Sequence, residues 1–172
     1  KDVKTSRYFH EQMKVYLRIF SPPGLEKLTK LWMPVGKRVV VIGGAIHGCE
    51  LAEFLVKRNR QVTLVHTEDI LGEGIPIEDQ MRLFPWFDRK GVVRLAGVNY
   101  ERISDDGLEV TDKQGQKQTL KADTYIVALP MLSNPDIVQK FSSLVKNTVA
   151  IGNCATGGLI VDAVYDGART GY

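Results

Sequence analysis

KRVVVIGGAIHG, residues 37–48, joins a run of β-branched residues to a glycine-rich turn. Residues 37–42 have the length and composition of a strand that is buried on both faces. The next segment, residues 49–60, is apolar on one helical face, which carries Leu51, Ala52, Leu55 and Val56. Residues 61–65 are predicted to form a second strand. A strand, a turn, a helix and a strand within about thirty residues predict a right-handed βαβ unit with parallel strands.

The turn fits the phosphate-binding pattern G-x-G-x-x-G at two of its three glycine positions. Gly43 lets the chain turn sharply off the strand, Gly48 allows close helix–strand packing, and Ala45 occupies the middle position. Backbone amides at the start of the helix, near Ile46, are then expected to face two linked phosphates without obstruction. The candidate contacts with the cofactor are Gly43, Gly44, Ala45, Ile46, His47 and Gly48.

The alternative for this turn is that its glycines serve only close packing of the helix on the strand. The order of elements decides between the two interpretations, because the turn follows a buried strand, opens a helix and is followed by a second strand. That context is what the phosphate-binding motif requires. Nucleotide binding is therefore the favoured hypothesis.

The ribose of a bound dinucleotide is expected at the end of the second strand, about 20 residues beyond the turn. His66, Thr67 and Glu68 occupy that position. His66 lacks the fixed negative charge of an NAD site but could donate a hydrogen bond to a 2′-phosphate. No arginine stands beside it, as in many NADP sites. Glu68 reaches the ribose only if the strand end is displaced. The choice between NAD and NADP stays open, and an exposed His66 without any cofactor contact is an equal alternative.

The remaining segments extend the same α/β pattern. Helices are predicted at 8–20, 25–32, 78–90 and 160–170, a third parallel strand at 92–95, and further buried strands at 123–129 and 148–152. Three short strands at 100–103, 108–111 and 117–120 form an antiparallel meander. In the helix at 78–90, Met81, Phe84 or Pro85, and Phe87 are expected to face inward. Pro85 also predicts a kink or an early end. The predicted fold class is α/β, a Rossmann-like fold with a parallel sheet and an antiparallel β-meander.

Composition and charge narrow the classes of function. A net charge of +3, spread without a run of like charges, disfavours binding to nucleic acid or to an anionic membrane. The apolar runs are too short to cross a bilayer and the first residues are polar, so a cytoplasmic location is expected. Cys49 and Cys154 lie far apart, which favours neither a disulfide framework nor a metal site. The ends, at Lys1 and Tyr172, suggest a piece excised from a longer polypeptide.

Several stretches together carry a resemblance to a known family. They are VVVIGGAIHGCELAEFL (39–55), GEGIP (72–76), WFDRKGV (86–92), ADTYIVALP (122–130), IGNC (151–154) and DAVYDGAR (162–169). With them, the chain resembles the C-terminal part of the long, multidomain Old Yellow Enzyme family. These are NADH:flavin oxidoreductases such as 2,4-dienoyl-CoA reductase, 2-enoate reductase and trimethylamine dehydrogenase. The resemblance covers about residues 25–172.

The resemblance implies a domain organisation. An NAD(P)-binding domain is inserted into an FAD-binding domain, and both follow a TIM barrel that carries FMN and an iron–sulfur cluster. Residues 1–35 are then leading helices of the inter-domain connection, 36–129 the NAD(P)-binding domain, and 130–172 the returning segment of the FAD-binding domain. In that segment, Gly152 and Asn153 match a Gly-Asp-Cys motif that contacts the flavin nucleotide, with Asn153 lacking the charge of the aspartate.

The implied function is to bind NAD(P)H and to position its nicotinamide for hydride transfer to a flavin, without a catalytic acid or base from this chain. FAD is shared with an upstream segment, and the partners are the flavin domains of the same polypeptide. The isolated chain is expected to be inactive. Two alternatives stay open: a barrel-less NADH oxidase or ferredoxin reductase-like flavoprotein, and a non-catalytic nucleotide-binding domain. The final substrate and the oligomeric state do not follow from the sequence.

Overall fold

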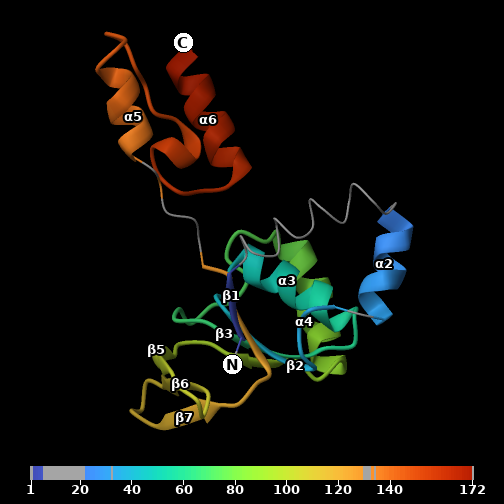
Figure 1. The fold of residues 1–172 in the computed structure, drawn as a ribbon. Helices are drawn as coiled ribbons and strands as arrows, with labels where there is room; N and C mark the ends of the chain where they lie inside the picture. Colours follow the sequence, from blue (N-terminus) through green and yellow to red (C-terminus); the bar gives the residue numbers. More distant parts are fainter. Residues whose placement is uncertain (1, 6–21, 32, 130–132, 134, 172) are drawn as a thin grey trace. The chain divides into compact units, whose positions relative to one another are not determined.

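The computed structural model describes residues 2–5, 22–31, 33–129, 133 and 135–171 (Figure 1). The chain divides into two compact units, Lys1–Leu129 and Pro130–Tyr172. The helix predicted at 8–20 lies outside the described residues.

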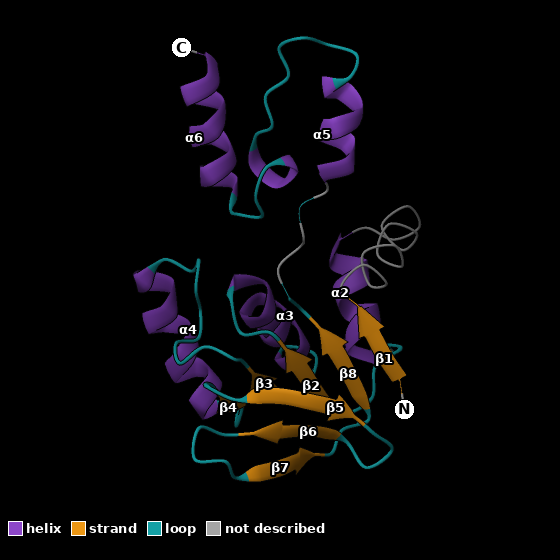
Figure 2. Ribbon diagram, turned by 90° about the vertical axis from the view of Figure 1, so that its left-hand side faces the viewer, coloured by secondary structure: helices purple, strands orange, loops and turns teal. Residues whose placement is uncertain are grey.

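A five-stranded parallel sheet forms the centre of the first unit, in the order β1-β8-β2-β3-β4. Its strands are β1 (Asp2–Thr5), β2 (Arg38–Ile42), β3 (Gln61–Val65), β4 (Val93–Leu95) and β8 (Thr124–Val127). Val41 in β2 lies opposite Leu64 in β3 and Ile126 in β8. Because neighbouring strands are parallel, the carboxyl ends of β2, β3 and β8 meet at one edge of the sheet (Figure 2).

Helices cover one face of this sheet. They are α3 (Ile46–Val56) and α4 (Ile77–Arg89), and a further helix, α2 (Pro22–Leu31), precedes β2. Leu55 of α3 and Phe87 of α4 are buried in one cluster with Val39 and Val41 of β2. Since side chains alternate along a strand, Val40 and Ile42 point to the other face. The structure confirms the prediction that this strand is buried on both faces.

An antiparallel meander packs on the other face. It consists of β5 (Asn99–Ile103), β6 (Leu108–Thr111) and β7 (Lys117–Leu120), paired in the order β5-β6-β7. Leu108 and Val110 of β6 share a buried cluster with Val40 of β2 and Tyr125 of β8. The predicted meander is confirmed, and with it the α/β fold class with a parallel sheet.

Two helix predictions need correction. Helix α3 begins at Ile46, where the phosphate-facing amides were expected, but it ends at Val56, four residues before the predicted end at residue 60. Helix α4 does not end early at Pro85 but continues to Arg89. Pro85 and Met81, one turn earlier, both lie on the exposed side, and Met81 is 72% exposed rather than facing inward. The missing hydrogen bond at Pro85 therefore falls on the water-facing side of the helix, where solvent replaces it.

The second unit contains α5 (Pro135–Ser142), a short 3₁₀ helix η1 (Gly152–Cys154) and α6 (Ile160–Gly171). Helix α6 confirms the last predicted helix, whereas the buried strand predicted at 148–152 is wrong. Val149 and Ile151 are 62% and 42% exposed, and the described residues of this unit include no strand with which the segment could pair.

The sequence also did not predict β1 or α5. Asp2–Thr5 pairs in parallel with β8, at the edge of the sheet, although residues 1–35 were expected to be helical. Four residues with one hydrophobic member are too short to show a strand period. Among the described residues, no helix has the length and apolar composition needed to cross a membrane.

Candidate functional site at the glycine-rich turn

The glycine-rich turn lies at the carboxyl end of β2, between the ends of β3 and β8. The Gly43 amide donates to the Val65 carbonyl at 2.9 Å, and the Ala128 amide donates to the Ile42 carbonyl at 2.7 Å. From β2 the chain proceeds to β3 and β4 on one side, and β8 joins on the other. In open α/β sheets, ligands bind in the crevice at such a reversal of strand order.

Two positions in this turn require glycine. Gly43 has φ +112°, and a Cβ there would lie 2.5 Å from the carbonyl oxygen of Ala128. A Cβ at Gly48 would lie 1.7 Å from the carbonyl oxygen of Gly43. Helix α3 therefore packs against the strand end as closely as the sequence pattern predicted. Close packing alone explains why these two positions are glycine. Only the polar groups of the turn can therefore indicate a ligand.

Ala45, at the middle position of the motif, is the N-cap residue of α3. Its backbone is extended, with φ −71° and ψ −174°, and its side chain makes no capping hydrogen bond. Any residue adopts such a conformation without strain. The departure from glycine therefore does not distort the turn.

The first amides of α3 are partly occupied. The Ile46 amide donates to the carbonyl of Glu73 at 2.8 Å, so the expectation of unobstructed amides is wrong for Ile46 itself. Within the described part of the chain, no acceptor faces the amides of Ala45, His47 and Gly48. Free amides at a helix N-terminus, combined with the helix dipole, favour an anion.

The loop after β3 closes on the turn from one side. The Gly72 amide donates to the Gly44 carbonyl at 2.7 Å, and a Cβ at Gly44 would lie 2.2 Å from the Leu71 side chain. The carbonyl of Glu73 fixes the start of α3, as described above. Residues 71–73 thus form one wall of the site, a role that the sequence did not predict.

His66 follows β3 and packs against the same turn. Its Cβ lies 2.8 Å from the position that a Cβ at Gly44 would take. The residue is only 8% exposed, so the alternative of an exposed His66 is wrong. Both ring nitrogens are buried without a hydrogen-bond partner among the described residues. Buried polar atoms in proteins are nearly always satisfied, so these two nitrogens call for a ligand or an ordered water.

Thr67 and Glu68 continue from His66 and are exposed. The Gly97 amide donates to the Glu68 carbonyl at 2.8 Å and holds this segment beside the end of β4. Beyond it lies a pocket of about 650 Å³, lined by Glu68, Asp69, Ile70, Glu73 and Gln80. The structure therefore brings the predicted strand-end residues next to the turn and adds this pocket to the site.

Two buried titratable groups border the turn. Cys49 Sγ donates to the Gly44 carbonyl at 3.3 Å, and burial raises the pKa of its thiol to about 11. The Tyr100 hydroxyl donates to the Val65 carbonyl at 3.0 Å, and burial raises its pKa to about 12. Both groups are protonated at neutral pH, and Cys49 is packed in the buried cluster between the helices and the sheet. Among the described residues, no group of three or more metal-binding side chains is found.

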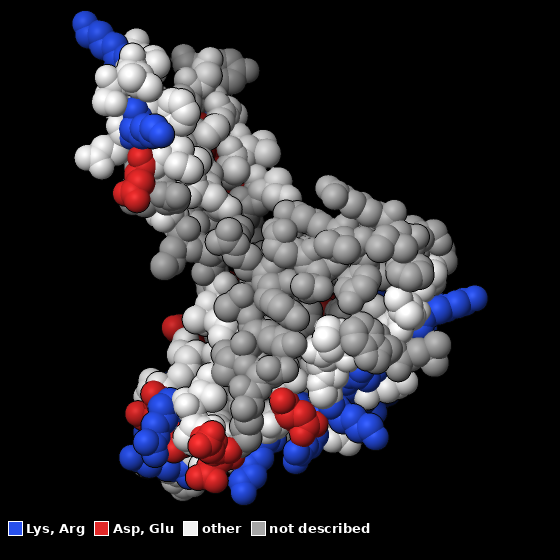
Figure 3. Space-filling model, viewed as in Figure 1, with Lys and Arg blue, Asp and Glu red and all other residues white. Residues whose placement is uncertain are grey.

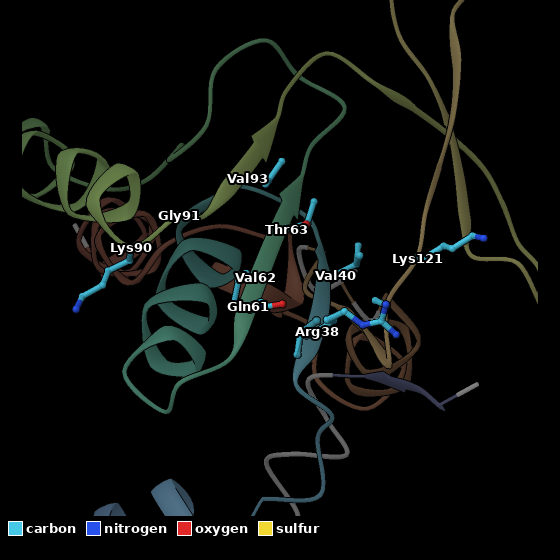
Figure 4. A pocket seen from close by; sticks show the side chains of 11 residues that line it. Arg38, Val40, Gln61, Val62, Thr63, Lys90, Gly91, Val93 and Lys121 are labelled. Carbon is cyan, nitrogen blue, oxygen red and sulfur yellow. The ribbon is translucent and has the colours of Figure 1, made fainter.

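A different pocket, of about 420 Å³, lies at the opposite edge of the sheet (Figure 4). Figure 4 shows Thr63 of β3 and Val93 of β4 pointing to the same side of the sheet, with Arg38 at the start of β2. The Arg38 guanidinium is already paired with Asp123, at 2.6 Å. None of the predicted site residues lines this pocket.

On the face seen in Figure 3, acidic and basic side chains are interspersed rather than gathered in one basic patch.

Gly152 and Asn153, the remaining predicted contacts, lie in the second unit. Gly152 has φ +56°, and its amide donates to the Asp166 carboxylate at 3.2 Å. The side-chain oxygen of Asn153 accepts from the Gly158 amide at 3.4 Å. Both residues therefore shape the turn that leads into α6.

Residues 15–163 match the family described as pyridine nucleotide-disulphide oxidoreductase. The chain is 29% identical to cinnamate reductase of Clostridium sporogenes, over 69% of this chain and 18% of that protein. It is 31% identical to soluble pyridine nucleotide transhydrogenase of Enterobacter sp. (strain 638), over 77% of this chain and 27% of that protein. The chain thus spans about a fifth to a quarter of the length of these curated relatives.

Solved structures show the same fold. 2-Naphthoyl-CoA reductase superposes with a TM-score of 0.70 at 23% identity, over 81% of this chain and 21% of that one. Histamine dehydrogenase from Rhizobium sp. 4-9 superposes with a TM-score of 0.70 at 18% identity, over 98% of this chain and 24% of that one. These likenesses confirm the Rossmann-like FAD/NAD(P)-binding fold.

The relatives also confirm the resemblance to the C-terminal nucleotide-binding region of the long Old Yellow Enzyme-family oxidoreductases. The matched relatives are oxidoreductases of several kinds, which agrees with the oxidoreductase class predicted from the sequence. With its turn, its sheet order and its match over residues 15–163, the chain belongs to the pyridine nucleotide-disulphide oxidoreductase family, whose members are flavoproteins that bind FAD and NAD(P).

Proposed function

We propose that this chain binds the pyrophosphate of a nicotinamide dinucleotide at residues 43–48 and positions the nicotinamide for hydride transfer to a flavin. The observation that supports this most is the set of amides at the start of α3. Those of Ala45, His47 and Gly48 have no acceptor among the described residues and lie where the strand order reverses. Family membership supplies the class of ligand.

The residues of the turn contribute in different ways to binding the pyrophosphate. The amides of Ala45, His47 and Gly48 donate to phosphate oxygens, and the dipole of α3 favours the negative charge. Gly43 and Gly48 allow the backbone geometry that brings these amides together. The Ile46 amide binds Glu73 and so holds the neighbouring loop in place.

The residues after β3 would hold the ribose. A ribose hydroxyl at this position satisfies a buried ring nitrogen of His66, which lacks a partner among the described residues. Thr67 and Glu68 are exposed beside it and offer further hydrogen-bonding groups. This arrangement accounts for the otherwise unexplained burial of an unpaired imidazole.

The chain's contribution to the reaction is positioning. When bound, the nicotinamide supplies the hydride, and the protein orients it. Cys49 and Tyr100, the buried titratable groups beside the turn, are held protonated by burial and serve as neither acid nor base at neutral pH.

The rest of the proposal concerns a longer polypeptide. There, Gly152 and Asn153 contact an FAD that is shared with an upstream segment, and a barrel with FMN and an iron–sulfur cluster accepts the electrons. The exposed apolar side chains of the second unit support a flavin domain of which these residues form only a part. They include Phe141, Ile160, Val161, Val164 and Tyr165.

A change at Ala45 separates nucleotide binding from folding. In Ala45→Asp, the new carboxylate caps α3 and is expected to stabilise the chain by about 0.5–2 kcal/mol. The same charge occupies the phosphate site, so the affinity for ADP, measured by calorimetry, should fall at least about a hundredfold. Ala45→Ser is the matched control, because it caps the helix without a charge and should retain most of the affinity. Unchanged ADP binding by Ala45→Asp would contradict the proposal.

A further inference from the structure

The pocket beside the turn is lined by residues of the loop after β3 and by Gln80 of α4. Glu68, on its rim, stands two residues beyond His66, whose side chain packs on the turn. Glu73, which also lines the pocket, accepts the amide hydrogen bond of Ile46 through its carbonyl. A dinucleotide whose pyrophosphate lies on the turn places its adenosine ribose at the end of the second strand of the unit, which borders this pocket.

The charge of this pocket is negative. Among the residues that the structure describes, its lining includes three carboxylates, Glu68, Asp69 and Glu73, and no lysine or arginine. Lys113, in the hairpin between β6 and β7, pairs with Asp69. Three carboxylates against this one ammonium leave two negative charges on the rim.

The remaining polar side chain of the pocket, Gln80, does not offset this charge. The side-chain amide of Gln80 donates to the carbonyls of Gly72 at 3.2 Å and Ile75 at 2.8 Å, so its donors are used within the loop. His66, beside the turn, is more than nine-tenths buried, and its ring nitrogens have no partner among the described residues. A neutral hydroxyl can reach such a site at little cost, whereas a phosphate would have to give up its hydration there.

We infer that the chain prefers a dinucleotide whose adenosine ribose keeps its 2′-hydroxyl, NADH, over the 2′-phosphorylated form, NADPH. This inference rests on the proposed function and adds the specificity of the same site. A phosphate monoester carries about −1.5 to −2 charges at pH 7, and it would lie against two negative charges. Near a protein surface, such repulsion corresponds to at least about a tenfold difference in affinity.

Two probes without nicotinamide test this preference directly. ADP-ribose and 2′-phospho-ADP-ribose are titrated separately into the chain by calorimetry, so the result depends only on the ribose group. ADP-ribose should bind at least about tenfold more tightly. Equal or tighter binding of the phosphorylated probe would overturn the inference and leave the turn as a pyrophosphate site. If neither probe binds, the proposed function fails, and the inference fails with it.

Charge variants identify the groups responsible. In the double variant Glu68→Gln, Glu73→Gln, the ratio of the two affinities should fall towards one, because the rim loses two negative charges. Glu78→Gln is the matched control, since Glu78 is exposed on the first turn of α4 and does not line the pocket. The ratio in the unchanged chain should also fall as salt is added, because exposed charges are screened. A ratio that the double variant leaves unchanged would overturn the assignment of specificity to this rim.

Discussion

Single residues in the turn differ in how strictly their identity is fixed. Gly43 and Gly48 cannot carry a side chain, because a Cβ at either would collide with the backbone. Ala45 stands in an extended conformation that suits any residue. The pattern G-x-G-x-x-G is therefore stricter at its ends than at its centre in this chain, and a departure at the middle position leaves the geometry intact.

The sequence predicted the packing roles of Gly43 and Gly48, because their positions relative to the strand determine them. It did not predict the burial of His66. That burial depends on Leu71 and the loop around it, which closes on Gly44 from a place five residues further along the chain. The local sequence pattern shows where a strand ends, but it does not show which loop covers that end in the folded chain.

Gly48→Ala should damage both stability and binding. The new Cβ would lie 1.7 Å from the Gly43 carbonyl, so α3 must shift away from the turn. We expect a loss of about 1–3 kcal/mol in the free energy of unfolding, measured in urea, together with weaker binding of ADP.

Gly91→Ala is the control for this change. Gly91 has φ +71°, and no atom lies within 4 Å of the position that a Cβ would take there. Only backbone strain of about 1 kcal/mol is therefore expected, with ADP binding unchanged. If Gly48→Ala were no less stable than Gly91→Ala and bound ADP normally, the close packing of the turn would be refuted.

At the scale of elements, the sequence predicted well wherever a period or a turn signal was present. The strands at β2 and β3, the three strands of the meander and α6 all appear within a residue or two of their predicted bounds. Hairpin turns and alternating apolar residues are local signals, so the meander could be predicted from the sequence.

Elements that depend on distant partners were predicted less well. β1 owes its strand conformation to pairing with β8, more than a hundred residues away. The segment at 148–152 has an apolar, β-branched composition, yet the described residues of its unit offer it no strand. Composition indicates that a segment prefers burial in a sheet, but pairing decides whether a strand forms.

An ion pair links the starts of β2 and β8. Asp123 accepts hydrogen bonds from the Arg38 guanidinium at 2.6 Å and from its backbone amide at 2.9 Å. These contacts hold the pKa of the Asp123 carboxyl below its ordinary value of 3.8. Because the folded-state pKa is depressed, the stabilisation is present above the unfolded pKa and is lost as the pH falls through the folded one.

Asp123→Asn should therefore lower the free energy of unfolding modestly at pH 7, since both side chains are exposed. The difference from the unchanged chain should shrink as the pH falls below 3.8. Denaturant titrations over a series of pH values measure it, and adding Arg38→Gln should cost little more, because the pair is already broken. A difference that stays constant across this range would show that the carboxyl charge is not involved.

At the scale of the whole molecule, the two units differ in how they bury apolar side chains. Among the described residues, the buried hydrophobic side chains all lie between Val35 and Ala128, in the first unit. The second unit exposes several large ones, which agrees with the proposal that it belongs to a domain completed by other parts of a longer protein. The candidate nucleotide site lies wholly in the unit that has its own core.

Fold class and family were within reach of the sequence, because the βαβ unit and the later motifs are specific as a set. The preference between NADH and NADPH could not be predicted from the sequence. In the proposed site it depends on Glu68 and Glu73, which line one pocket because the loop's contacts with the turn hold them there.

The central claim is that the start of α3 binds a pyrophosphate, and a titration of the ¹⁵N-labelled chain with ADP, followed by NMR, tests it most directly. The largest shifts should occur at the amides of Ala45, His47 and Gly48, with smaller ones at residues 66–68. If saturating ADP moved instead the amides of Arg38, Gln61 and Lys121 in the pocket at the opposite edge, or moved none, the claim would be contradicted.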